Sequence, residues 1–165
     1  MGSRVVMEAC GLSVLMQIPS MDGGDPLIVT EHIDFQTRGN GEMADLTGKV
    51  AAIVERTGLS AGVVVVFASG ATGAVTTIEY EPGLVEDMKG ALERIAPEGG
   101  EYAHNQRWGD GNGHSHIRAS VIGPSLAVPF AGRKLLLGTW QQIVFLDLDT
   151  TPRYRRVVVQ IIGEG

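Results

Sequence analysis

The sequence predicts an α+β fold in which a mainly antiparallel β-sandwich packs against two helices. Apolar residues make up 44% of the 165 residues, which is enough to fill the core of one domain. The predicted elements follow the order strand, helix, two strands, helix and then a run of about five strands. A parallel sheet requires regular alternation of strands and helices, which this order lacks.

The first predicted strand and helix lie in the first third of the chain. Residues 28–37 alternate apolar and polar side chains, the pattern of a half-buried strand. Asp45 suits a helix N-cap, because its carboxylate accepts hydrogen bonds from free amides of the first turn. Apolar residues then recur at helical spacing as far as Gly58, which suits a left-handed C-cap.

Two strands and a second helix are predicted in the middle of the chain. Residues 63–67 form an apolar, mostly β-branched run without polar alternation, which predicts a strand covered on both faces. Residues 74–80 predict the next strand. A helix is expected from Leu84 to Ile95, where apolar residues again recur at helical spacing, and Pro97 closes it.

The last third of the chain is predicted to be nearly all strand. Turns that contain glycine or proline separate short segments rich in apolar and β-branched residues. These segments are residues 116–122, 125–130, 134–137, 140–148 and 154–162.

The N-terminal segment differs from the rest. Residues 1–26 are expected to form an N-terminal arm or extension, and residues 27–165 a single domain. Residues 19–26 contain two prolines and adjacent glycines, as a linker does. The arm is either loosely held or docked on a neighbouring subunit.

Composition bounds the class of protein. The formal net charge of −6 argues against a broadly basic nucleic-acid surface. Cys10 is the single cysteine, so an intramolecular disulfide and a thiolate metal cluster are both excluded, which fits a reducing cytoplasm. The longest apolar runs fall short of the ~18 residues of a membrane span, so a membrane partner is not predicted.

The chemistry concentrates in residues 102–120, which hold three of the four histidines. Glycines and asparagines interrupt the first half of this stretch, and its last part is predicted to be a strand. Because strand side chains alternate between faces, His114, His116 and Arg118 would share one face. His104 would join them from the preceding loop.

Three interpretations of these histidines are open. In the first, His104, His114 and His116 bind a divalent metal, most naturally Zn²⁺, which takes three nitrogen ligands and keeps a fourth position open. In the second, the histidines work without metal and hold an anion with Arg107 and Arg118. In the third, they are merely hydrogen-bonded in a polar loop.

Several other residues are candidates for the same site. Glu79 and Asp110 would act as catalytic bases or orient a ligating imidazole. Trp140 would stack on an aromatic part of a substrate, or else pack in an interface.

Six short motifs resemble those of the YjbQ-like family, often labelled secondary thiamine-phosphate synthase. They are Asp87-Met88 in the second predicted helix, Tyr102-x-His104, Ser115-His116-Ile117, Gly123-x-Ser125, the segment Leu137-Gly138-Thr139-Trp140-Gln141 and the terminal Gly163-Glu164. The resemblance covers about residues 28–164. It implies a jelly-roll-like sandwich, a homotrimer, a metal pocket near the histidines and weak thiamine-phosphate synthase activity. Where other members carry a histidine–threonine pair, this chain has residues 68–70, Ala-Ser-Gly.

The resulting hypothesis is a metal-binding homotrimer that acts as a metal-assisted enzyme on a small phosphorylated molecule. The histidines would bind the metal, Arg107 and Arg118 would neutralise phosphate, and Trp140 and Gln141 would position the organic part. The alternative is a non-enzymatic trimer that binds a metal or a small-molecule ligand.

Overall fold

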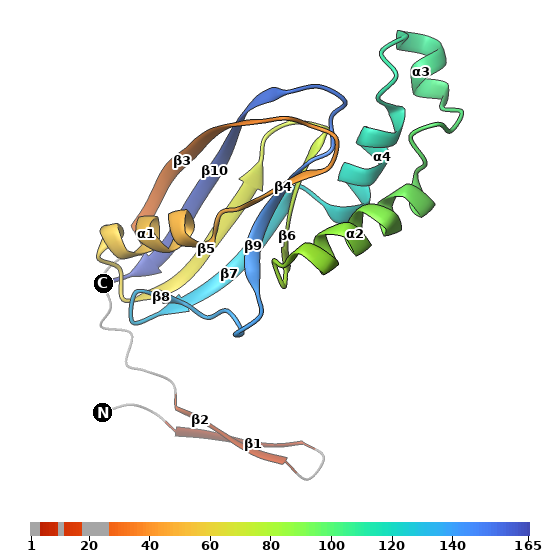
Figure 1. Ribbon diagram of the computed structural model, residues 1–165. Helices are drawn as coiled ribbons and strands as arrows, with labels where there is room; N and C mark the ends of the chain where they lie inside the picture. Colours follow the sequence, from red (N-terminus) through yellow and green to blue (C-terminus); the bar gives the residue numbers. More distant parts are fainter. Residues whose placement is uncertain (1–3, 10–11, 18–26) are drawn as a thin grey trace.

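The computed structural model describes residues 4–9, 12–17 and 27–165 (Figure 1). Strands β1 (Arg4–Ala9) and β2 (Leu12–Gln17) pair as an antiparallel hairpin. The predicted N-terminal arm, residues 1–26, lies partly outside the described residues.

Two antiparallel sheets form the body of the domain. The five-stranded sheet has the order β3-β10-β5-β7-β8, and the three-stranded sheet has the order β4-β9-β6. The strands are β3 (Leu27–Thr37), β4 (Glu42–Asp45), β5 (Ala61–Ala68), β6 (Gly73–Ile78), β7 (Ser125–Ala131), β8 (Lys134–Leu135), β9 (Gln142–Asp147) and β10 (Arg153–Glu164).

The predicted α+β class is confirmed, although the described residues contain four helices rather than two. They are α1 (Thr47–Thr57), α2 (Pro82–Ile95), α3 (Ala103–Trp108) and α4 (Gly113–Ile122). The N-cap of α1 is Leu46 and not Asp45 as predicted, although the Asp45 side chain accepts a hydrogen bond from the Thr47 amide at 2.8 Å. Gly58 ends this helix in the left-handed conformation with a φ of 73°.

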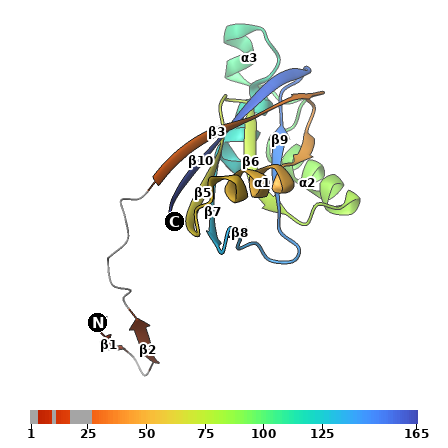
Figure 2. The same ribbon diagram turned by 90° about the vertical axis from the view of Figure 1, so that its left-hand side faces the viewer.

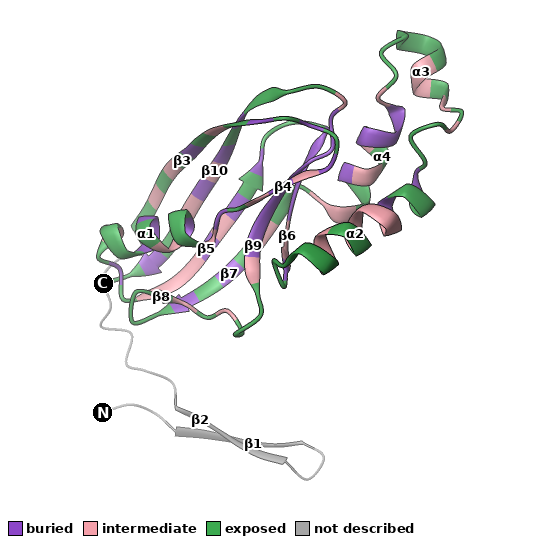
Figure 3. Ribbon diagram, in the orientation of Figure 1, coloured by how far each residue is buried: buried purple, intermediate pink, exposed green. Residues whose placement is uncertain are grey.

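The molecule is layered, with a core on each side of the three-stranded sheet (Figures 1 and 2). Alternate residues of β9 separate the cores: Phe145 packs toward the five-stranded sheet and α1, and Leu146 packs toward α2 and α4. The layers therefore run from the five-stranded sheet to the three-stranded sheet to helices α2 and α4. In Figure 3, buried residues lie along the strands of both sheets, whereas α3 has none.

Buried ion pairs connect the strands at one end of the sandwich. Asp147 is fully buried and accepts hydrogen bonds from Arg155, with Nε at 2.7 Å, and from the Thr37 hydroxyl. Burial opposes ionisation of nearby Asp149, but hydrogen bonds from Arg153 and Thr72 outweigh it and lower the pKa of this carboxyl. Both carboxylates therefore tie β9 and its following turn to their neighbours.

Other local predictions were also wrong. Residues 116–122 belong to helix α4 instead of a strand, and the buried residues Ser115 and Ala119 are four positions apart, as on one face of a helix. His104 lies in helix α3 rather than in a loop. Within one chain the 63–67 strand is covered on one face only: Val64 and Val66 are fully buried, whereas Phe67 is 40% exposed. Among the described residues, no helix is long and apolar enough to cross a membrane.

Candidate functional site

The candidate site is built on α3 and α4, which project from the sandwich (Figures 1 and 2). Gly109 ends α3 in the left-handed conformation, φ 70°, and so allows a sharp turn. The Gly113 amide donates to the Asn105 side-chain oxygen at 2.8 Å, which fixes the start of α4 against α3. A Cβ at position 113 would lie only 2.6 Å from the Tyr102 Cβ, so this contact requires glycine.

Two of the predicted histidines meet at this junction. The rings of His104 and His116 lie with their centroids 4.5 Å apart and their planes tilted by 38°. Nδ1 of His104 is 3.3 Å from Oδ1 of Asp110. That nitrogen is buried and has no aligned hydrogen-bond partner among the described residues.

Asn112 completes what we call the histidine–aspartate cluster, which comprises His104, Asp110, Asn112 and His116. With its amide nitrogen turned inward, Asn112 places that nitrogen 3.1 and 3.2 Å from the two Asp110 carboxylate oxygens. The same nitrogen lies 3.3 Å from Nε2 of His116. Carboxylate oxygens, an imidazole nitrogen and an amide group thus converge on one position.

His114 does not belong to this cluster. Residues two apart on a helix point about 200° apart, so His114 and His116 face different sides of α4. His114 is a buried residue, 3% exposed, and its ring centroid lies 6.3 Å from that of Tyr102. Burial, and next the charge of Arg118, lower the pKa of His114. The predicted shared face of His114, His116 and Arg118 was therefore wrong, because it assumed strand geometry.

Arg118 is engaged elsewhere, too. Its Nε donates to the Ala96 carbonyl at 2.8 Å, and its guanidinium pairs with Glu93, so that it ties α4 to the end of α2. The predicted contact with phosphate does not fit this arrangement. Arg107 is exposed on α3, with its guanidinium carbon 5.4 Å from the Trp108 ring centroid.

The remaining predicted residues lie away from the cluster within one chain. Glu79 lies before the start of α2, whereas Arg118 attaches α4 to the end of this helix. Because a helix of 14 residues is about 21 Å long, the length of α2 separates Glu79 from that attachment. Trp140 is 69% exposed in the loop before β9. This loop lies at the end of the domain opposite α3 in both views (Figures 1 and 2). Gln141 accepts from the Gly138 amide at 2.8 Å in that same loop.

Asn112 is the cluster residue that the sequence analysis missed. The signal was present in the Asn112-x-x-x-His116 spacing, which brings two side chains together on a helix but not on a strand. Assigning a strand to residues 116–122 hid it. Across residues 27–165, no three His, Cys, Asp or Glu side chains are already arranged as a metal-ligand group.

An antiparallel sandwich that carries an imidazole–carboxylate cluster on a projecting helix pair defines the class of this protein. The chain matches the family model described as "UPF0047 protein YjbQ-like" over residues 31–164. It therefore belongs to this family, as its motifs had indicated. The match begins after residues 1–26, which lie outside it.

Relatives and solved structures agree with this assignment. The chain is 35% identical over 137 residues to a UPF0047 protein of Methanothermobacter thermautotrophicus, covering 83% of this chain and 94% of the relative. It is 37% identical over 130 residues to one from Archaeoglobus fulgidus, covering 79% and 98%. The crystal structure of a YbjQ-like protein of unknown function from Sulfolobus solfataricus has a TM-score of 0.76 at 30% identity, with 84% of this chain and 100% of that chain covered.

Proposed function

We propose that this protein binds a divalent cation, Zn²⁺ in the first instance, at the histidine–aspartate cluster. The observation that carries the proposal is the convergence of the Asp110 carboxylate and Nε2 of His116 on the Asn112 amide. A cation that takes the place of the Asn112 amide nitrogen would have the Asp110 carboxylate and Nε2 of His116 as ligands. The unpartnered, buried Nδ1 of His104 beside Asp110 supports the same placement.

The donor set suits zinc. Imidazole nitrogens and a carboxylate oxygen are ordinary zinc ligands, and a catalytic site keeps one position open. His104, Asp110 and His116 would be the ligands, and Asn112 would either add its oxygen or orient the others. This set replaces the three-histidine set that strand geometry suggested, because His114 faces away.

We further propose that the site acts on a small phosphorylated molecule. When bound, the cation would supply a Lewis acid that stabilises charge developing on phosphate oxygens. Arg107 is exposed one turn from His104 on α3 and would attract the same anionic group. Thiamine-phosphate synthesis, which the YjbQ-like resemblance implies, fits such a site only as a slow reaction. A pyrophosphate leaving group needs several cations, and Arg118 is already paired with Glu93.

The proposed assembly is a homotrimer, with the threefold symmetry taken from the resemblance. The exposed apolar face of the five-stranded sheet supports association, because Ile28 and Phe67 are 60% and 40% exposed in a single chain. A trimer that binds metal or ligand without turnover is the alternative. It would show stoichiometric zinc binding and no conversion of a phosphorylated substrate.

Calorimetric zinc titration tests the metal proposal. The wild-type protein should bind one zinc per chain, and H116A and D110A should lose this binding. H32A is the matched control, because His32 is an exposed histidine on β3 and should leave binding unchanged. H114A should also retain zinc. Equal affinities in H116A and the wild type would refute the site.

Turnover separates the enzyme from the alternative. Thiamine-phosphate formation by the zinc-loaded protein should fall far below about 10 per second, the median for enzymes. A rate in that ordinary range would contradict the expectation that this is a slow side reaction.

A further inference from the structure

A hollow between helix α1 and strand β8 takes no part in the proposed cation site. Helix α1 and β8 contact each other at the end of the domain opposite α3 (Figures 1 and 2). The space between them, which we call the α1–β8 hollow, measures about 420 Å³. This volume lies in the ordinary range of sites for small molecules.

Apolar groups come from both walls of the α1–β8 hollow. One wall is a single face of α1, on which Thr47, Ala51 and Glu55 lie in a row because they are spaced by four residues. The facing wall contains Leu135 and Leu137, which are half-buried and pack against the core. An apolar part of a ligand would therefore lose contact with water on two sides.

The charged groups of the hollow are two cations and one carboxylate. Arg133 and Lys134 carry the positive charges, and Glu55 carries the negative charge. All three residues are exposed, and within residues 27–165 none of them forms an ion pair. The hollow thus carries an excess of positive charge, although the chain as a whole has a formal net charge of −6.

The turn that carries Arg133 contains an unusual residue for its conformation. Gly132 and Arg133 connect β7 to β8, and their φ angles are both positive, 57° and 64°. Two-residue turns of this kind favour glycine or asparagine, because a larger side chain is strained at positive φ. The Arg133 amide donates to the Ser60 carbonyl at 3.3 Å, which holds the turn in place. Strained residues of this kind gather at ligand sites, so the strain at Arg133 suggests a use for its side chain.

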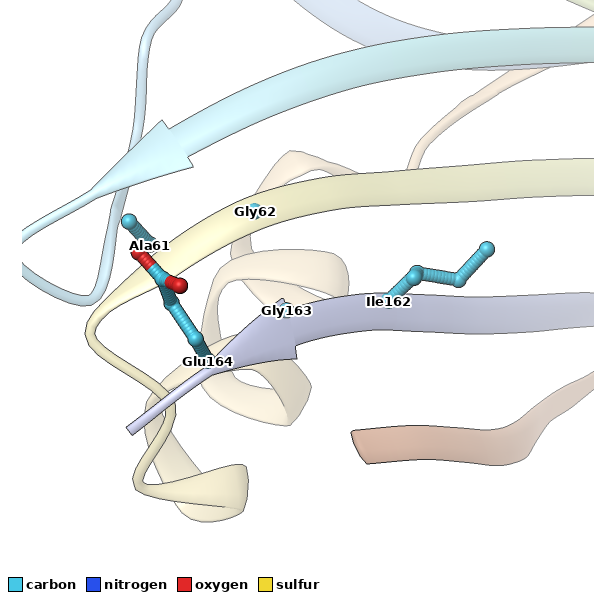
Figure 4. Close-up of a pocket in the computed structure, with 5 residues that line it drawn as sticks. All are labelled: Ala61, Gly62, Ile162, Gly163 and Glu164. Atoms are coloured by element: carbon cyan, nitrogen blue, oxygen red, sulfur yellow. The ribbon is translucent and has the colours of Figure 1, made fainter. Parts of the chain in front are cut away.

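A second hollow shows what the first one adds. It measures about 230 Å³ and lies over the cross-strand pair Gly62 and Gly163 (Figure 4). Of the residues that line it, Glu164 is the charged one, so this second hollow offers an anion no positive charge. The α1–β8 hollow is the larger of the two and combines apolar walls with positive charge.

We propose that the α1–β8 hollow binds a small amphipathic anion, with one carboxylate or phosphate head and a short apolar tail. The head lies between Arg133 and Lys134, because a guanidinium pairs with either group through two hydrogen bonds. The tail lies against Ala51 and the leucines of the facing wall. Glu55 repels a second acidic group and so favours ligands with a single anionic head. This site is separate from the histidine–aspartate cluster and does not rest on it.

Ligand-observed NMR titrations of the zinc-free protein test the site with four probes. Hexanoate and hexyl phosphate carry the two anionic heads, hexylamine carries a cation, and hexanol is neutral. At least one of the two anions should bind about tenfold tighter than hexylamine and hexanol, as one charged hydrogen bond implies. The tighter anion of the two identifies the head group.

Variants then place the probe in the hollow. R133G removes a cation and gives the turn the residue that its conformation favours, so it should weaken anion binding by about tenfold without lowering the unfolding temperature. A51F should block the hollow and abolish binding. R56A is the matched control, because Arg56 is an exposed arginine of α1 that does not line the hollow, and it should bind as the wild type does. H116A should also bind as the wild type does.

Three results would overturn the proposal. The first is equal binding of anions and hexylamine by the wild type. The second is equal anion affinity in R133G and R56A, which would show that the Arg133 charge does not contribute. The third is loss of anion binding in H116A, which would place the probe at the histidine–aspartate cluster instead. Failure of zinc to bind that cluster would leave this proposal intact.

Discussion

Two neighbouring arginines on β10 offer a direct test of how the sandwich is held together. Arg155 and Arg156 each form a two-pronged pair with an aspartate, but on opposite faces of the strand. Arg155 pairs with Asp147, whose side chain is fully buried, and Arg156 pairs with Asp34 in an exposed position. Replacing each aspartate with asparagine removes the same charge from two different environments.

We expect D147N to lower the free energy of unfolding by about 3 kcal/mol. Removing one partner of a buried pair costs about 3–5 kcal/mol, because the other charge stays buried without compensation. The lower end applies here because Asp149 remains 3.7 Å from the Arg155 guanidinium. For a chain of this size, about 2–4 °C of unfolding temperature accompanies each kcal/mol, so the midpoint should fall by about 6–12 °C.

Urea denaturation and calorimetry of D147N and D34N provide the measurement. D34N should change stability little, since water screens its partner. The double variant D147N/R155M should lose less than the sum of the single losses, because it no longer buries an unpaired charge. A D147N midpoint within 2 °C of the D34N midpoint, roughly the shift of 1 kcal/mol or less, would show that this network does not hold the sheets.

Three further predictions concern the helices that carry the site. R118M should lower the free energy of unfolding by about 1.5–3 kcal/mol in urea titrations, because it removes charged hydrogen bonds to Glu93 and Ala96. For His114, burial lowers the pKa of the folded state below the unfolded value of about 6.5, so the unfolded state binds the proton first as pH falls. The unfolding temperature of the wild type should therefore drop between pH 7 and 5.5 more than that of H114Q, and parallel curves would refute this. Zinc at 100 times its Kd should slow amide exchange in residues 103–108 by up to about 100-fold, with no such effect in H116A.

The sheets could be predicted from sequence because their burial is simple. In β9 the apolar residues face a core on each side of the strand, and in β5 and β10 alternate apolar residues face a core within the same chain, as their hydrophobic pattern predicts. The strand at residues 63–67 was predicted correctly, but the covering of its second face was not, because an apolar pattern alone does not show whether the chain itself covers that face.

The helix at residues 113–122 could not be predicted in the same way. Its buried face consists of Gly113, His114, Ser115 and Ala119, small or polar residues that carry no hydrophobic periodicity. Ile117 and Val121, which do repeat at helical spacing, face outward. The spacing of His114 and His116 then favoured a strand. Strand geometry placed His114 on the same face as His116 and did not bring Asn112 close to them.

The outward-facing apolar residues of α4 also bear on how firmly the site is held in place. A helix whose apolar residues face outward and whose polar residues face its own domain gains little from packing within one chain. The α4 helix is instead held by specific contacts: Arg118 to α2, and the Gly113 amide to Asn105. Because few apolar side chains hold α3 and α4 in place, local opening of these two helices should cost less free energy than global unfolding. The proposed cation at Asp110 and His116 would favour the ordered state of the two helices, so its binding should raise the cost of this local opening.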